Sequence, residues 1–350
     1  MAINFDDIHG KNINKYVEEI RAYYLDAIRA VSAITYSLPL NANKEFYFRN
    51  HPEVSKKVDE ILKKLYDNLY GSTVTGANTE WNLAVEKNNK LAEFIFGSKL
   101  SQLPKQYIDK YFTDNAGARR SFVSRKTNGL NLSDRVWRNT RQFKGELELA
   151  LEVGIGEGKS AALIAKDVRK YLNEPDRLFR KVRDVNGELR LSKSAKAYSP
   201  GAGVNRSSYR NAVRLTSNET NFAYEASQKE KRQQQDFIVG IEIRVSPSHS
   251  SISDKGGISC DALAGRYPKD FDFTYKWHVN CICISLNILK TKEELDSDTD
   301  LIISGKEPLK TSVNLVDKHP KNFNNYVKEN SEKWDNWKTK PKFFENNKTN

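Results

Sequence analysis

Hydrophobic positions in the first third of the chain recur at helical spacing. They fall three or four residues apart between residues 13 and 31, between 54 and 69, and between 81 and 96. Gly71 and Gly97 follow the second and third runs, and glycine is typical of the residue just after a helix. The pattern predicts three helices whose apolar stripes form a core, with Gly71 ending the second.

The second half of the chain changes from helical spacing to alternation. A long helix is predicted over 207–235, and the alternation at 237–245 predicts a strand. A second strand is predicted over 277–286. Asn186-Gly187 is a strong two-residue hairpin signal within 182–191. Ser133 is expected to cap a helix that holds Trp137. The elements together predict an α+β fold that is mainly α-helical, with a small β-sheet in the C-terminal part.

A glycine-rich stretch, Gly154-Ile155-Gly156-Glu157-Gly158-Lys159-Ser160, has the composition of a phosphate-binding loop. The P-loop needs Gly-x4-Gly-Lys-Ser/Thr, and Val153 stands where its first glycine belongs. The preceding residues have a helical pattern rather than that of a strand. The glycines are therefore expected to end one helix and Ser160 to cap the next. The pattern gives no support for an ATPase.

Composition divides the chain into three parts: a helical N-terminal region at 1–118, a central domain at 119–290, and a tail at 291–350 made of a polar linker and an aromatic, basic end. The tail ends in aromatics among lysines and asparagines. Such a mixture suits contact with nucleic acid. Docking onto the body of the protein is favoured, because the aromatics would otherwise be exposed.

The net charge is +12, which is consistent with an acidic partner, with nucleic acid first and an anionic membrane surface second; the alternative is that the excess lysine only keeps the surface solvated. No apolar run approaches the roughly 20 residues of a membrane span, and the start of the chain lacks the apolar core of a signal peptide. The protein is expected in a cytoplasm. Basic residues cluster at 119–144 beside aromatics, and the solvated face of a helix is favoured there over nucleic-acid contact. The candidate phosphate contacts are Arg119, Arg120, Arg125 and Lys126.

All three cysteines and two of the five histidines lie between residues 249 and 283. Thiolate and imidazole are the ligands that zinc takes in tetrahedral sites. At most four of the candidates would bind one ion, and these candidates are His249, Cys260, His278, Cys281 and Cys283. The alternative is plain burial, because buried cysteine behaves as a small hydrophobe. A disulfide is not expected, since three cysteines leave one over.

The long helix carries Arg214 and Glu219, which are five residues apart and so do not form an i,i+4 pair. A structural clamp between two elements of one domain is the favoured interpretation, and a catalytic glutamate is the alternative.

In order and spacing, several motifs together resemble the phage Mu protein F-like family of minor head, or head morphogenesis, proteins of tailed phages and prophages. The resemblance covers residues 120–290 and extends more weakly into both ends of the chain. The motifs are Leu132-Ser133-x-Arg135-Val136-Trp137, Gly154-x3-Gly158-x-Ser160, Ser207-Ser208-Tyr209-x-Asn211-Ala212, Arg214-Leu215-x3-Glu219, Cys260-Asp261…Gly265 and His278-x2-Cys281-x-Cys283. His249, His278 and the three cysteines match the family's His/Cys positions.

The resemblance implies a role in capsid morphogenesis. It implies a protein of low copy number that associates with the portal vertex and other capsid proteins, is packaged inside the head, contacts DNA through phosphates, and aids assembly, packaging or ejection. It implies localisation in the virion, and in the cytoplasm of the bacterial host during assembly. An enzyme is not expected. The alternative is an effector in the virion, either ADP-ribosyltransferase-like or a metal-dependent hydrolase, which would require an open cleft.

Overall fold

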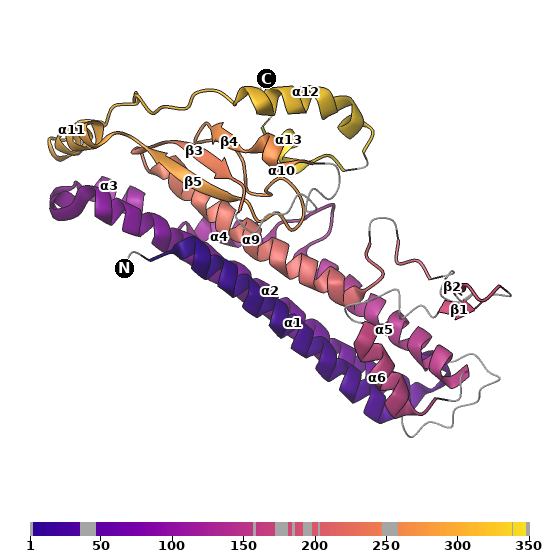
Figure 1. Cartoon of the computed structure of the whole chain (residues 1–350). Helices are drawn as coiled ribbons and strands as arrows, with labels where there is room; N and C mark the ends of the chain where they lie inside the picture. Colours follow the sequence, from indigo (N-terminus) through magenta and orange to yellow (C-terminus); the bar gives the residue numbers. More distant parts are fainter. Residues whose placement is uncertain are drawn as a thin grey trace. The chain divides into compact units, whose positions relative to one another are not determined.

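Figure 1 presents a computed structural model of the chain. The residues that the structure describes are 3–35, 47–156, 159–171, 181–183, 186–191, 198–201, 204–246, 258–337 and 339–347. His249, one of the predicted metal ligands, lies outside these ranges.

Helices dominate the described residues, and a three-stranded sheet accompanies them. The predicted α+β class, mainly helical with a small C-terminal sheet, is therefore confirmed. The helices are α1 (Phe5–Thr35), α2 (Pro52–Phe96), α3 (Lys105–Phe112), α4 (Ala116–Ser124), α5 (Leu132–Gly156), α6 (Ala161–Tyr171), α9 (Ser208–Gln234), α10 (Cys260–Leu263), α11 (Lys292–Ile303), α12 (Lys321–Asp335) and α13 (Lys342–Asn346), with 3-10 turns η1 (Phe48–Asn50) and η2 (Gly97–Gln102). The strands are β1 (Lys181–Arg183), β2 (Leu189–Leu191), β3 (Ile238–Arg244), β4 (Gly265–Tyr267) and β5 (Ile284–Leu289).

The chain forms two compact units, and each is built from separate stretches of sequence. The first unit comprises Met1–Asn12, Gly76–Val123 and Asn218–Asn350, and the second comprises Ile13–Thr75 and Ser124–Ser217. Helices α1, α2, α4 and α9 each contribute residues to both units. This division differs from the three consecutive parts that composition suggested, because long helices carry the chain from one unit to the other.

The second unit is a helical assembly around one apolar core from α1, α2, α5, α6 and α9. The predicted end of a helix at Gly71 is wrong, because α2 continues unbroken to Phe96. Buried Leu69 and Thr73 flank the glycine, so the buried stripe continues through this turn. A mid-helix glycine costs about 1 kcal/mol relative to alanine, which packing on both sides offsets. Gly97, at φ +48°, does end the helix as predicted.

Asn131, rather than the predicted Ser133, caps α5. The Asn131 side chain accepts a hydrogen bond from the Asp134 backbone N–H at 2.8 Å, and the Asp134 carboxylate accepts one from the Asn131 N–H at 3.2 Å. This reciprocal pair satisfies donors that the helix start leaves open. The Ser133 hydroxyl instead lies 2.6 Å from the Tyr66 hydroxyl on α2. Ser160 acts on α6 as predicted, accepting from the Leu163 N–H at 3.4 Å.

A buried carboxyl on α5 holds the start of α9. Glu146 accepts hydrogen bonds from the backbone N–H and the hydroxyl of Ser208, both at 2.7 Å, and from Gln142 at 3.0 Å. Burial nevertheless dominates and raises the pKa of Glu146 from 4.5 to about 7. The carboxyl is therefore half protonated near neutral pH.

This carboxyl predicts that acid strengthens the fold. Between about pH 4.5 and 7 the folded protein keeps the Glu146 proton that the unfolded chain has lost, so the free energy of unfolding falls as pH rises. The expected loss across this range is about 3 kcal/mol. Urea unfolding of the wild type and of Glu146→Gln at several pH values isolates the effect, since only the wild type carries this proton. A constant difference between the two proteins across the range would contradict the assignment.

The first unit is organised on an antiparallel sheet with strand order β4-β3-β5. Ile241 and Ile243 of the central strand are buried, and their partners across the sheet include Tyr267 and Ser285. The first-unit part of α9 lies along one side of the sheet and α12 along the other (Figure 1). The predicted strand over 237–245 and helix over 207–235 are confirmed within a few residues. The predicted hairpin around Asn186-Gly187 is present in the second unit, where β1 pairs antiparallel with β2, but the innermost pair is Arg183 with Leu189, a register that does not show the two-residue turn.

The C-terminal aromatics dock onto the first unit. Phe323, Trp334 and Phe343 are each at most 3% exposed and join the cluster that contains Tyr267 and Trp277. The prediction that the tail aromatics dock onto the body of the protein is thus confirmed. The stretch expected to be a polar linker contains a helix, α11. Thr291 caps it in a reciprocal arrangement with Glu294, and Ile302 anchors it in the core.

Candidate metal centre

Three of the five predicted ligands come together in the first unit. One ligand atom each from Cys260, His278 and Cys281 lies within 4.8 Å of both others, so the group can hold a metal ion. The Cys260 Sγ is 3.0 Å from the His278 Nε2 and 3.8 Å from the Cys281 Sγ. Residues up to 21 positions apart in sequence thus meet at one point. The two sulfurs are buried and the imidazole is half-buried.

Cys260 is placed by a short capped turn. It is the first residue of α10, and Ser259 caps that turn by accepting from the Ala262 N–H at 3.3 Å. The Ser259 N–H in turn donates to the Tyr326 hydroxyl of α12 at 2.9 Å. Asn322 of α12 also donates to the carbonyls of Ala262 and Ala264. The docked tail therefore fixes the position of the first ligand.

The ring of His278 is oriented by the backbone. Its Nδ1 lies 2.8 Å from the carbonyl oxygen of Val279, which accepts only, so Nδ1 carries the proton. In the neutral ring the lone pair then sits on Nε2, which faces the sulfur of Cys260. A histidine that ligates a metal through one nitrogen commonly donates from the other in this way.

The predicted strand over 277–286 begins later than expected. Strand β5 starts at Ile284, and both Cys281 and Cys283 lie in the turn before it. Lys276 and Asn280 adopt left-handed backbone conformations, with φ of +52° and +61°. A chain with left-handed residues cannot alternate as a strand does. The turn instead brings the sulfur of Cys281 round to Cys260.

Protonation within the cluster is uneven. Hydrogen bonds from Cys260 and Cys283, with Lys276 nearby, hold the pKa of Cys281 well below its ordinary value. Hydrogen bonds to Cys281 and Cys283, together with burial, raise the pKa of Cys260. For Cys283 the hydrogen bond with Cys260 lowers the pKa, but the one with Cys281 and burial outweigh it and raise it to about 12. Cys281 is therefore the favoured thiolate, the form that binds metals.

The cluster is enclosed by aromatic rings. Trp277, Phe323, Trp334 and Phe343 belong to the same buried cluster as the three cysteines. Trp277 packs edge-to-face on Phe343 at 5.1 Å between ring centroids. Such walls exclude water and strengthen electrostatic interactions within the site. Aromatic surroundings are equally compatible with thiols that are simply buried. The argument for a metal therefore depends on the imidazole of His278 and its orientation.

A buried polar network lies next to the cluster. Lys276 donates to the carbonyl oxygen of Cys283 at 2.9 Å and lies 3.7 Å from the carboxylate of Glu225 on α9. That carboxylate accepts from the Ser285 hydroxyl at 2.7 Å, and Ser285 accepts from Arg232 at 3.2 Å. Burial lowers the pKa of Arg232, against the opposing effect of Glu225. The sequence signal for this network is the polar set at 225, 228 and 232, which recurs at helical spacing on the buried face of α9.

The remaining candidates do not share one site. Glu219 is buried in the first unit, and Arg214 is half-buried in the second, where it donates to the side chain of Asn211 at 3.0 Å. The two residues of the predicted clamp therefore belong to different units rather than to one domain.

The four basic candidates are also distributed over both units. Arg119 and Arg120 belong to the first unit, and Arg125 and Lys126 to the second. Arg119 donates to the side chain of Asn82 at 2.6 Å and lies 4.0 Å from Asp114. Arg125 is half-buried. The prediction that these four residues form a phosphate-contact set stays a prediction.

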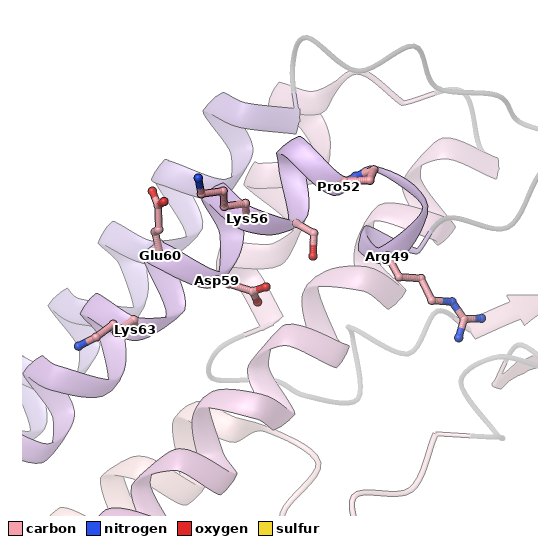
Figure 2. A pocket seen from close by; sticks show the side chains of 7 residues that line it. Arg49, Pro52, Lys56, Asp59, Glu60 and Lys63 are labelled. Atoms are coloured by element: carbon pink, nitrogen blue, oxygen red, sulfur yellow. The ribbon is translucent and has the colours of Figure 1, made fainter.

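A surface hollow of about 630 Å³ on the second unit offers no convergent chemistry. Its lining comes from Arg49 and the first turns of α2, and it mixes basic and acidic side chains. Figure 2 shows Arg49 directed away from Lys56 and Glu60. Groups that diverge in this way do not converge on a single ligand.

No protein-family profile, curated protein or solved structure matches this chain. Among the described ranges, none of the helices combines the length and the apolar content that crossing a membrane requires.

Proposed function

We propose that this chain is a phage minor head protein whose first unit is stabilised by a zinc ion bound to Cys260, His278 and Cys281. The observation that carries the zinc site is the convergence of an oriented imidazole and two buried sulfurs. The motifs that resemble the Mu F-like family support the capsid role. They include these three residues in order, together with the α9 motif.

The spacing of the two sulfurs fits one tetrahedral ion. With Zn–S bonds of about 2.3 Å and tetrahedral angles, two thiolates are about 3.8 Å apart. The Cys260 and Cys281 sulfurs are 3.8 Å apart. The Cys260 Sγ and the His278 Nε2 are 3.0 Å apart. This distance is shorter than the roughly 3.6 Å that a thiolate and an imidazole nitrogen take on one tetrahedral zinc ion. A small opening of the imidazole away from Cys260 accommodates the ion.

Cys283 is the best candidate for a fourth ligand. Its thiol is buried in the same cluster as Cys260 and Cys281, and these two residues shift its pKa, although it lies outside the group of three. Its carbonyl is already held by Lys276. A site closed by four protein ligands is structural, whereas a catalytic zinc keeps a position open for water. This assignment makes the ion a structural support for the fold.

The capsid role predicts a low-copy protein inside the particle. In particles purified after induction of a lysogen that encodes this chain, mass spectrometry is expected to detect the protein, and protease is expected to reach it only after the heads are opened. Cys260→Ser/Cys281→Ser is expected to lower incorporation severalfold, because the first unit loses its support. Lys11→Gln, an exposed change, serves as the control. Particles that lack the wild-type protein would refute the capsid role and leave the zinc site untouched.

The enzyme alternative gains no support from the buried polar groups. Glu225, Arg232 and Ser285 combine the residue types of a transferase site, but each is at most 1% exposed. A substrate needs an open cleft beside such groups. We therefore retain the structural role as the proposal.

A further inference from the structure

An exposed strip of α5 in the second unit combines one aromatic and two cationic side chains. Trp137, Arg138 and Arg141 are all exposed, and Trp137 is 43% exposed. On a helix these three positions cover an arc of about 100°, so they share one face. Among the described residues of this unit, only Trp137 and Leu163 are exposed large hydrophobic side chains. The exposure of the tryptophan therefore distinguishes this face.

The tryptophan is held in place from the side of α2. Tyr66 contacts Trp137 edge-to-face, with ring centroids 5.4 Å apart, and the Tyr66 hydroxyl is 2.6 Å from that of Ser133. A hollow of about 480 Å³ opens beside the two rings, and Lys63 also lines it. The indole is thus an anchored platform with space next to it.

The opposite side of the strip is bordered by α9, where positive charge accumulates. Asn211 donates to Gln142 of α5 at 2.9 Å. One turn from this contact, Arg138 lies near Arg214, which is half-buried, and burial followed by the charge of Arg138 lowers the pKa of Arg214. In the described part of the chain, no acidic side chain forms an ion pair with Arg138, Arg141 or Arg214.

The acidic groups nearby are already engaged. Asp59 pairs with Lys144 at 2.6 Å, and Asp134 accepts from the backbone N–H of Asn131. Both line the hollow beside Trp137. The arginines therefore keep an excess of positive charge that is available to an anionic partner.

We propose that Trp137, Arg138, Arg141 and Arg214 form a binding site for single-stranded nucleic acid. An unpaired base stacks on the indole, and the guanidinium groups bind the flanking phosphates. The site belongs to the second unit, whereas the metal ligands belong to the first. It rests on the proposed function only in taking DNA as the polymer. An anionic membrane is the weaker alternative, because one tryptophan among charged side chains offers little apolar area for insertion.

The test is fluorescence anisotropy of the full-length protein with a labelled 20-nucleotide oligo-dT at several salt concentrations. Trp137→Leu keeps apolar contact with Tyr66 but loses the stacking surface, so affinity is expected to fall roughly tenfold with little change in salt dependence. Arg138→Gln/Arg141→Gln is expected to reduce the slope of log K against log salt by about 1.4, or about 0.7 per phosphate contact. Trp137→Phe should retain most of the affinity.

The control is Lys11→Gln/Arg29→Gln, which removes the same charge from exposed helix positions outside the strip. It is expected to bind the oligonucleotide within about twofold of the wild type. The site is refuted if Trp137→Leu binds like the wild type, if the control loses as much slope as the arginine pair, or if the wild type binds phosphatidylserine vesicles through these residues and not the oligonucleotide. Failure here leaves incorporation into particles unaffected, so the two proposals are separable.

Discussion

Chelation of zinc is expected to destabilise the wild-type protein by about 4 kcal/mol or more, measured against the protein in free zinc at about a thousandfold excess over its dissociation constant. The ion binds the folded arrangement of Cys260, His278 and Cys281 and not the dispersed ligands of an unfolded chain. Its removal also leaves two thiols and an imidazole in an aromatic core without their shared partner. Thermal unfolding with and without a strong chelator measures the effect.

The Cys281→Ser variant separates metal binding from simple burial. If the ion is present, this variant is already destabilised, and the chelator has no further effect on it. If Cys281 only fills space, the substitution costs a smaller amount, about 1–3 kcal/mol for an unsatisfied hydroxyl, and the chelator leaves both proteins unchanged. A chelator response of equal size in both proteins would place the ion elsewhere.

Glu225→Ala is expected to cost about 3–5 kcal/mol in the free energy of unfolding. The carboxylate of Glu225 lies 3.7 Å from Lys276 and accepts from Ser285, which in turn binds Arg232. Truncation leaves two buried cations with less opposing charge and takes a hydrogen-bond acceptor from Ser285. Urea unfolding followed by circular dichroism measures the loss.

The matched control is Glu93→Ala, which removes an exposed glutamate from α2 whose partner Lys90 is also exposed. It is expected to change the free energy of unfolding by less than about 1 kcal/mol, as is typical of exposed ion pairs. Glu225→Leu/Lys276→Met is expected to recover part of the loss, because it removes one of the two buried cations together with the carboxylate, while Arg232 remains. A Glu225→Ala protein as stable as the control would show that the network contributes nothing.

The sequence predicted the elements with long regular patterns. The helix of 207–235 and the strand of 237–245 follow from periodicity, which records burial directly. The predicted helix end at Gly71 was wrong because the turns on both sides of this glycine stay in the core. Leu69 and Thr73 are both buried there. The prediction that Ser133 caps α5 was wrong because Asn131, two residues earlier, forms reciprocal hydrogen bonds with Asp134 and caps the helix instead.

The metal candidates were predictable by residue type but not by geometry. Cysteine and histidine are metal ligands by residue type, so Cys260, His278 and Cys281 could be named from the sequence among five candidates, but not singled out. The turn that joins them depends on left-handed conformations at Lys276 and Asn280, residues without the usual glycine signal. The charged network around Glu225 was not predicted from the sequence either. It joins residues of α9 to Ser285 of β5, and hydrophobic periodicity does not show which elements pack together.

Elemental analysis of the purified protein tests the central claim most directly. We expect about one zinc ion per chain in the wild type, and none in Cys260→Ser/Cys281→Ser prepared in the same way. A wild-type protein that is fully folded and free of metal would contradict the zinc-bound first unit.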